Sequence, residues 1–262
     1  MPDLLVERSG GVVTLTLNRP ERKNALSDGL LRSLRAACLE IAERQEDRAV
    51  VLTGAGDGFC SGGDLTDPTI VRELRRGRGS ALAWMRLVGS TTMALHQLPQ
   101  PTIAAVNGAA IGAGANMAMA CDLVVASIGA RFSQGFMQRG LIPDFGGTWL
   151  LPRLVGLHRA KQLAFLGESL TATDALEMGL VNRVVEADQL AAAVQEWAAR
   201  LSASAPLALS MAKRLLNSSS SVSMNEALER EAVAQNVAFS SADMAEAMRG
   251  FVERRPPEFS GE

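Results

Sequence analysis

A long apolar run over residues 101–127 restricts the fold of this chain more than any other feature. The run approaches the length needed to cross a membrane, but it contains Asn107, Asn116, Asp122 and several glycines. Polar groups at these positions are costly in lipid and are readily satisfied inside a protein. The run therefore predicts a segment buried in a protein core.

The first two-thirds of the chain predicts repeated strand and helix units. Residues 11–17 alternate apolar and polar side chains, which predicts a half-buried strand. A helix should follow Ser27, which can cap it, because apolar residues then recur at helical spacing. Residues 49–54, 102–108 and 122–127 predict further buried strands. An α/β fold follows from this alternation.

The last part of the chain changes to helix-forming residues. Three stretches at 206–216, 224–239 and 243–255 are separated by serine-rich breaks. Their apolar faces are larger than three short helices can bury among themselves. We therefore expect residues 1–200 to form the core with the site, and residues 201–262 to form a helical region that packs against another subunit.

The composition excludes several classes of protein. With 47% hydrophobic residues in 262, the chain can build a sizeable core, and a formal charge of −2 gives no general attraction to nucleic acid or to an anionic membrane. The three cysteines fit neither a disulfide framework nor a zinc cluster, and His96 and His158 belong to no metal-ligand pair. The N-terminus has no leader-like apolar run. We expect a cytoplasmic protein without a metal, acting on a small molecule.

Two glycine-rich segments, residues 54–65 and 107–123, each lie between a predicted strand and a predicted helix. Small residues there leave backbone N–H groups available and let a ligand approach the main chain, so an anion or a developing oxyanion can be held. Tight turns and close helix packing explain either segment alone equally well. Neither segment matches the phosphate-binding loop or the dinucleotide fingerprint.

Four segments taken together resemble the crotonase, or enoyl-CoA hydratase/isomerase, superfamily. In family order they are LNRPERKNAL at 17–26, FCSGGDL at 59–65, the apolar run at 101–127 and IPDFGGTWLLPRLVG at 142–156. The resemblance implies an α/β spiral of β-β-α turns with a C-terminal helical trimerisation region. It also implies an acyl-CoA thioester as substrate, no cofactor apart from the coenzyme A of that substrate, and a homotrimer or a hexamer made of two trimers.

The resemblance assigns roles to individual positions. The two oxyanion-hole N–H donors fall on Gly63 and Ala113, where paired donors stabilise negative charge on a thioester oxygen. Asp64 is also expected to fix its own loop. The positions expected to bind coenzyme A or the acyl group are Lys23, Ala25, Ser61, Gly62, Asp64, Leu65, Asn116 and Phe136.

The chain departs from the hydratases of this superfamily at two positions. Their two glutamates correspond to Asn116 and Phe136, and hydration needs two positioned carboxylates to act as base and acid. Asp144 instead matches the catalytic aspartate of the isomerase branch, which includes the ring-epoxide isomerase of phenylacetate degradation. Without the resemblance, Pro-Asp-x-Gly is an ordinary turn sequence. Asn116 either orients substrate or water, or has a structural role.

Three hypotheses follow. The first is an enoyl-CoA isomerase in which Asp144 moves a proton, and the second is a hydratase-like enzyme that uses water held by Asn116 and Asp144. The third is a non-catalytic protein of the same fold that binds acyl-CoA or RNA, for which the arginines of residues 72–79 are a local patch. Cys60 and Ser61 are weaker candidates as nucleophiles, because no histidine lies in a matching motif.

Overall fold

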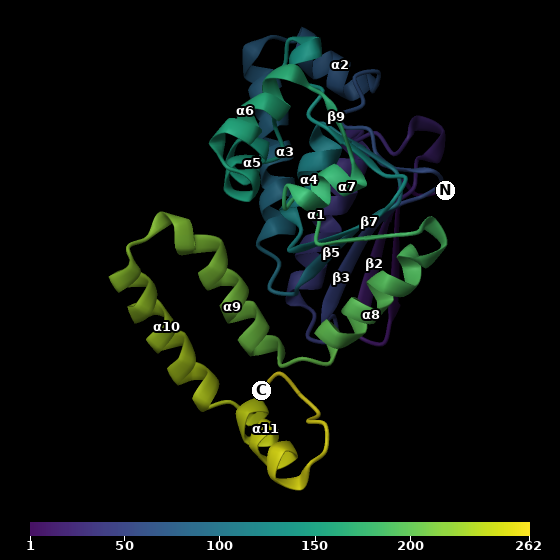
Figure 1. Ribbon diagram of the computed structural model, residues 1–262. Coiled ribbons are helices and arrows are strands. Elements are labelled where there is room, and N and C mark those ends of the chain that lie inside the picture. Colours follow the sequence, from purple (N-terminus) through teal and green to yellow (C-terminus); the bar gives the residue numbers. More distant parts are fainter.

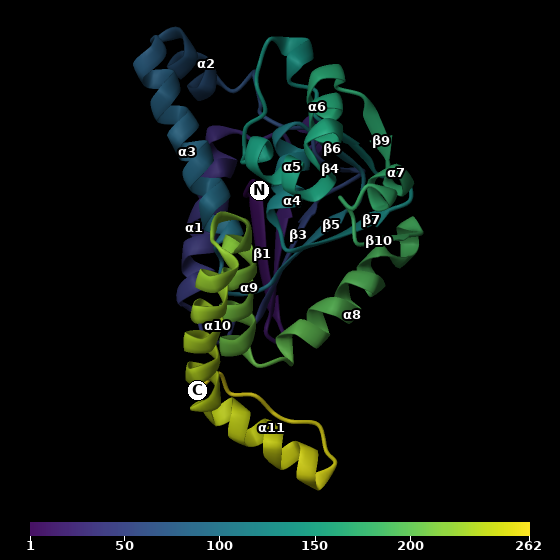
Figure 2. The same cartoon turned by 60° about the vertical axis from the view of Figure 1, so that its left-hand side comes forward.

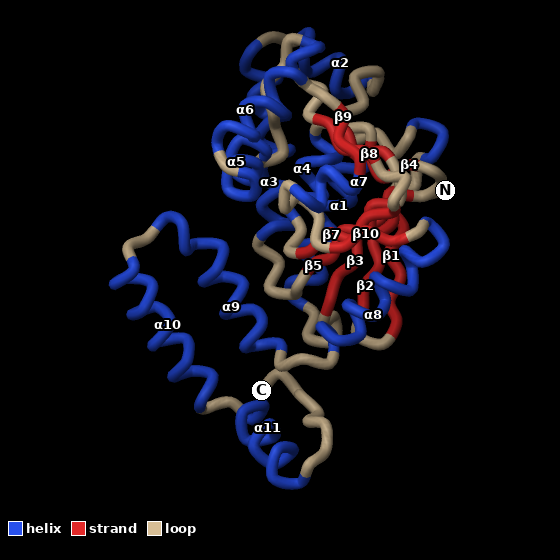
Figure 3. The backbone as a smooth tube through the Cα atoms, in the orientation of Figure 1, coloured by secondary structure: helices blue, strands red, loops and turns tan.

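The fold is built around two β-sheets. The computed structural model describes the whole chain, residues 1–262, and Figure 3 shows the strands of the two sheets. The larger sheet has the order β1-β2-β3-β5-β7-β10, and the smaller sheet has the order β4-β6-β8-β9. The strands of the larger sheet are β1 (Leu4–Ser9), β2 (Val12–Leu17), β3 (Ala49–Gly54), β5 (Thr102–Val106), β7 (Leu123–Ser127) and β10 (Arg183–Val185). Those of the smaller sheet are β4 (Gly58–Cys60), β6 (Ala109–Ile111), β8 (Arg131–Ser133) and β9 (Ser169–Thr171).

The chain passes repeatedly from the larger sheet to the smaller sheet and then into helical structure. β3 leads to β4, β5 to β6, and β7 to β8, and each set of neighbouring strands runs parallel. Only the pairs β1 with β2 and β8 with β9 are antiparallel. The expected spiral of β-β-α turns is therefore confirmed.

Helices cover both faces of the larger sheet (Figure 1). The helices of the core are α1 (Asp28–Glu43), α2 (Pro68–Arg75), α3 (Arg78–His96), α4 (Ala113–Ala120), α5 (Gly147–Val155), α6 (Leu157–Leu166), α7 (Ala172–Glu177) and α8 (Leu190–Ser202). Short 3-10 turns lie at Pro20–Arg22, Met137–Arg139, Ala187–Gln189 and Ser219–Ser221. One face of the sheet packs on α8, and the main apolar core on the other side includes residues of α1, α4 and the smaller sheet.

Most strands and helices expected from the sequence are present. Ser27 caps α1 as predicted, with its Oγ accepting a hydrogen bond of 3.1 Å from Leu30 N. Two expectations were incomplete. The glycine-rich segments are not simple links between strand and helix, because each contains a strand of the smaller sheet, and β1 had no predicted counterpart. Strands of three residues are too short for a side-chain alternation to indicate them.

The last three helices stand apart from the sheets (Figures 1 and 2). They are α9 (Pro206–Ser218), α10 (Met224–Phe239) and α11 (Ala242–Glu253). Lys213 of α9 fastens them to the core, since its Nζ lies 2.7 Å from Asp122 Oδ2 and donates to the Gln100 carbonyl at 3.0 Å. The same Asp122 oxygen accepts from the backbone and side chain of Thr102. Asp122 therefore links α9 to β5 and has a structural role.

Close packing of α4 against β4 sets the position of the glycine-rich segments. A Cβ atom on Gly114 would overlap the carbonyl group of Cys60, so only glycine lets the helix come this near to the strand. Gly89 offers a contrast, because it lies within α3 and a Cβ atom there would meet nothing within 4 Å.

The same substitution should therefore have opposite effects at these two helical glycines. Gly114→Ala is expected to lower the free energy of unfolding by about 1–3 kcal/mol through overpacking. Gly89→Ala is expected to raise it by about 0.5–1 kcal/mol through helix propensity. Denaturant unfolding of both variants measures this difference. Equal effects of the two substitutions would contradict the close packing of α4 on β4.

Candidate active site

Backbone pairing joins two loops that lie far apart in the sequence. Leu26 N donates to the Gly62 carbonyl at 2.8 Å, and Asp64 N donates to the Leu26 carbonyl at 3.0 Å, which makes a parallel bridge between Leu26 and Gly63. Ser61 N extends this pairing with a bond of 3.0 Å to the Lys23 carbonyl. N–H groups alternate in direction along an extended chain, so the N–H of Gly63 points away from Leu26.

Buried polar groups hold this pair of loops in place. Asn24 is fully buried, with Nδ2 donating to the Ala55 and Gly58 carbonyls and Oδ1 accepting from Arg19 N. Lys23 and Asn24 have φ of 50° and 55°, a left-handed backbone conformation that asparagine tolerates better than most residues. Asn24 is not among the site residues predicted from the sequence, although an asparagine in a turn-rich segment is the signal that could have found it.

Asp64 fixes its own loop, in agreement with one of its expected roles. Its Oδ2 lies 2.9 Å from Arg19 Nη2, and its Oδ1 accepts from the backbone and hydroxyl of Thr66 at 3.0 and 2.7 Å. Burial opposes ionisation of Asp64, but the hydrogen bonds from Thr66 and Arg19 outweigh it and lower the pKa of the carboxyl. The carboxylate is thus committed to neighbouring protein groups.

The first residue of α4 lies beside these loops. Ala113 follows Gly112, whose φ is 56°, and the first N–H groups of a helix have no carbonyl acceptor within it. A Cβ atom on Gly62 would lie 2.9 Å from the Ile111 carbonyl oxygen and 3.6 Å from Ala113 N. The structure therefore places the Gly62–Gly63 backbone next to the N-terminus of α4. A Cβ atom on Gly63 would meet nothing within 4 Å, so open space adjoins this residue.

Asp144 lies in a strained turn before α5. Phe145 has φ of 48°, which is unusual for a residue other than glycine, and its ring is buried. The Asp144 carbonyl accepts hydrogen bonds from Gly147 N at 2.9 Å and from Asn116 Nδ2 at 2.7 Å. Asn116 belongs to α4 and lies three residues, about one helical turn, beyond Ala113. Its hydrogen bond therefore holds the Asp144 turn near the N-terminal end of α4, where the Ala113 N–H lies.

The carboxyl group of Asp144 is largely withdrawn from water. Its Oδ1 is buried and has no hydrogen-bond partner. Burial, opposed only weakly by its own backbone, raises the pKa of Asp144 from 3.8 to about 6. A carboxyl group with such a pKa exchanges protons readily near neutral pH, which suits a general acid or base.

The other predicted site residues are placed around the paired loops and α4. Ala25 is buried, whereas Ser61 and Leu65 are exposed. Lys23 is exposed and its Nζ lies 2.7 Å from Asp57 Oδ2. The Phe136 ring is buried, and it lies 3.4 Å from where a Cβ atom of Gly112 would be. The structure thus brings Phe136 close to the start of α4.

The surroundings of Cys60 and His96 argue against nucleophilic catalysis by a cysteine or by a serine with a histidine base. Cys60 is fully buried, and burial raises the pKa of its thiol to about 12, so little thiolate forms at neutral pH. His96 is bonded through Nδ1 to the Ala120 carbonyl at 3.1 Å and its ring packs edge-on against Trp149. No group of three or more His, Cys, Asp or Glu side chains is arranged to hold a metal ion.

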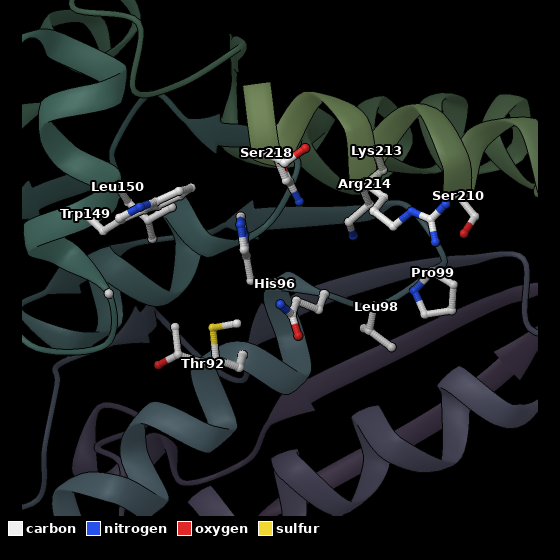
Figure 4. A pocket seen from close by; sticks show the side chains of 14 residues that line it. Thr92, His96, Leu98, Pro99, Trp149, Leu150, Ser210, Lys213, Arg214 and Ser218 are labelled. Atoms are coloured by element: carbon white, nitrogen blue, oxygen red, sulfur yellow. The ribbon is translucent and has the colours of Figure 1, made fainter. Parts of the chain in front are cut away.

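A large cavity lies elsewhere. It has a volume of about 760 Å³ and lies between α3, α5 and α9, with His96, Trp149 and Lys213 in its wall (Figure 4). It reaches Gly146 of the Asp144 turn, but Gly63, Ala113 and Asp144 do not line it. This cavity is therefore distinct from the group of candidate catalytic residues.

Comparison with known proteins gives the family. The family model described as enoyl-CoA hydratase/isomerase matches residues 7–262. The chain belongs to this family. It is therefore an acyl-CoA enzyme of the crotonase superfamily, as the motifs predicted. No helix of this family member is both long enough and apolar enough to span a membrane.

The relatives of this chain include both an isomerase and hydratases. The chain is 41% identical to the 1,2-epoxyphenylacetyl-CoA isomerase of Escherichia coli over 96% of the chain and 95% of the relative. It is 37% identical to the short-chain-enoyl-CoA hydratase of Clostridium acetobutylicum over 97% of the chain and 95% of the relative. The crystal structure of an enoyl-CoA hydratase from Bacillus anthracis superimposes with a TM-score of 0.93 at 33% identity, covering 99% of this chain and 100% of that chain.

The raised pKa of Asp144 predicts a pH-dependent cost in stability. The unfolded chain ionises this carboxyl near 3.8 and the folded protein near 6, so stability should fall as the pH rises between these values. At pH 8 the free energy of unfolding of Asp144→Asn is expected to exceed that of wild type by up to about 3 kcal/mol, which raises its unfolding temperature. At pH 4 the two proteins should be nearly equal in stability.

Asp64→Asn is the matched control for this prediction. Because the pKa of Asp64 is lowered, loss of its charge should destabilise the protein at pH 8. Thermal unfolding at the two pH values distinguishes the variants. If Asp144→Asn and wild type are equally stable at both pH values, Asp144 is not held in a desolvated environment.

Proposed function

We propose that this enzyme isomerises an enoyl-CoA by moving a proton from one carbon of the acyl chain to another, with Asp144 as the group that carries it. The observation behind the proposal is the half-buried carboxyl of Asp144, whose Oδ1 is buried without a hydrogen-bond partner and whose pKa is raised to about 6. A carboxyl group left unsatisfied inside a protein is costly, and it persists where it has a chemical task.

The proposed reaction uses one carboxylate and two backbone donors. Asp144 removes a proton from the carbon next to the thioester of a 3-enoyl-CoA. The electrons of that C–H bond pass to the thioester oxygen, which accepts hydrogen bonds from the N–H groups of Gly63 and Ala113. Asp144 then returns the proton to the fourth carbon, and the double bond comes to lie between the second and third carbons. Each donor of this kind contributes about 2.7–4 kcal/mol to the transition state.

The arrangement of the site supports these roles. The N–H of Gly63 points away from the paired loop, and the N–H of Ala113 is the first of a helix whose dipole favours negative charge. We propose that the backbone around Lys23, Ala25 and Ser61 holds the coenzyme A part of the substrate. The reaction changes no oxidation state, so we propose that it needs no cofactor other than the coenzyme A in the substrate.

A hydratase-like reaction is the second candidate, because a named relative is a hydratase. Two features weigh against it. Phe136 offers no carboxylate, and both polar atoms of the Asn116 side chain are already bonded to Gln134 and Asp144. A water molecule would then be activated by Asp144 alone, whereas hydration needs both a base and an acid.

The basic patch that suggested RNA binding is partly neutralised. Glu73 lies 3.1 Å from Arg76 and 3.4 Å from Arg72 on the exposed surface of α2 and its C-terminal end. These ion pairs on an exposed helix are typical of an ordinary solvated helix face.

Purified enzyme is expected to convert 3-enoyl-CoA to 2-enoyl-CoA. Asp144→Asn should lower kcat by at least about a hundredfold while binding of a CoA ester survives. The wild-type rate should also fall as the pH drops below about 6, because the protonated carboxyl cannot accept a proton. Spectrophotometric assays with 3-enoyl-CoA and crotonyl-CoA measure both reactions. Full activity of Asp144→Asn would exclude Asp144 as the base, and rapid hydration of crotonyl-CoA by wild type would favour the second candidate.

We also propose that α9–α11 join subunits into a trimer or a dimer of trimers. Phe251 and Val252 of α11 are 82% and 75% exposed in the single chain. Large apolar side chains with this exposure are typical of a contact surface. Wild type should have a mass of three or six chains of 27.7 kDa.

Phe251→Glu is expected to shift the assembly toward smaller species in light scattering, because it places a charge on the proposed contact. Leu39→Glu, on the exposed side of α1, is the matched control and should leave the mass unchanged. A monomeric wild type would contradict the proposal.

A further inference from the structure

Asn116 is completely buried within α4 and uses both ends of its side-chain amide. Its Nδ2 donates to the Asp144 carbonyl at 2.7 Å, and its Oδ1 accepts from Gln134 Nε2 at 2.9 Å. The orientation of the amide follows from its partners, because a backbone carbonyl can only accept and therefore requires the NH₂ group. Gln134 is itself only 4% exposed, so this chain of hydrogen bonds lies inside the protein.

The amide of Asn116 also touches the backbone of the turn that it holds. A Cβ atom on Gly147 would overlap Asn116 Nδ2, and it would lie 2.6 Å from Asn116 Cγ. This contact leaves no space for a ligand between Asn116 and Gly147. A longer side chain at position 116 would collide with Gly147, and an aspartate would direct a carboxylate oxygen at the Asp144 carbonyl.

The turn held in this way is strained. Phe145 has a left-handed backbone conformation that is unfavourable for a bulky residue, so neighbouring structure must hold it in place. No other residue donates a hydrogen bond to the Asp144 carboxyl, whose Oδ1 is buried without a partner. The aim of the carboxyl therefore depends on the backbone of residues 144–147.

We infer that Asn116, supported by Gln134, is a positioning residue that holds the Asp144 turn and so aims the Asp144 carboxyl at the substrate. The kinetic part of this inference rests on the proposed isomerase function. Asn116 acts through Asp144 and does not contact substrate, so its loss should slow the chemical step more than it weakens binding.

Asn116→Leu tests the inference, since leucine has the same number and branching of side-chain heavy atoms as asparagine but cannot hydrogen-bond. Losing one partner of a buried hydrogen bond typically corresponds to about a fivefold to 150-fold effect. We expect kcat for 3-enoyl-CoA to fall at least about tenfold, with KM changed less than about threefold. Hydrogen–deuterium exchange of the amides in residues 144–147 should be at least about tenfold faster than in wild type.

Asn182→Leu is the matched control. Asn182 also makes a side-chain hydrogen bond to backbone, from Val124 N to its Oδ1 at 2.7 Å, but it lies at β7 and β10 and outside the site. It should leave kcat and exchange at residues 144–147 unchanged. If Asn116→Leu does not fold, Gln134→Leu serves as the second variant. It removes the support of Asn116 and should speed exchange in the same segment.

The outcomes separate this inference from the proposed function. Unchanged kcat and unchanged exchange in Asn116→Leu would overturn the inference, and so would a raised KM with unchanged kcat, which would place Asn116 against the substrate. If wild type does not isomerise 3-enoyl-CoA but exchange at residues 144–147 still rises in the variant, the proposed function is wrong and the positioning of the turn stands.

Discussion

The pairing of Leu26 with Gly62 and Asp64 is the interaction on which the site depends. It consists of two backbone hydrogen bonds between loops that are far apart in the sequence. By using the groups on one side of residues 62–64, it leaves the Gly63 N–H on the other side without a partner in this pairing. Asn24 and Asp64 maintain the pairing through buried polar contacts. A donor held in place before substrate arrives needs no reorganisation during the reaction.

The two aspartates of the site, Asp64 and Asp144, lie in opposite kinds of surroundings. The Asp64 carboxylate is stabilised by Arg19 and Thr66, whereas Oδ1 of Asp144 is buried without a hydrogen-bond partner. Hydrogen bonds lower the pKa of Asp64, and burial raises the pKa of Asp144. One aspartate therefore stays ionised and holds a loop, and the other can gain and lose a proton near neutral pH. The difference lies in their surroundings, since the side chains are chemically identical.

α4 connects the paired loops to the Asp144 turn. Its first residue, Ala113, carries the second proposed N–H donor, and Asn116 donates a hydrogen bond to the carbonyl of Asp144. Glycine at position 114 lets the whole helix approach β4 closely enough for this arrangement. A shift of α4 would therefore move a proposed oxyanion donor and the turn that carries the proposed base together. Such coupling within one rigid element suits a site in which small displacements affect rate.

The sequence by itself determined the alternation of strands and helices, the cap of α1 by Ser27, the C-terminal helices and, through its motifs, the family. These features depend on local spacing and on residue types, both of which are visible in the chain. Only the tertiary structure decided the short strands of the smaller sheet, the left-handed backbone of Phe145, and the partners of Asn116. Gln134 had no sequence signal at all, because its contact with Asn116 arises from packing between separate turns of the spiral. The pKa of Asp144 likewise depends on how deeply distant segments bury it, which no local pattern records.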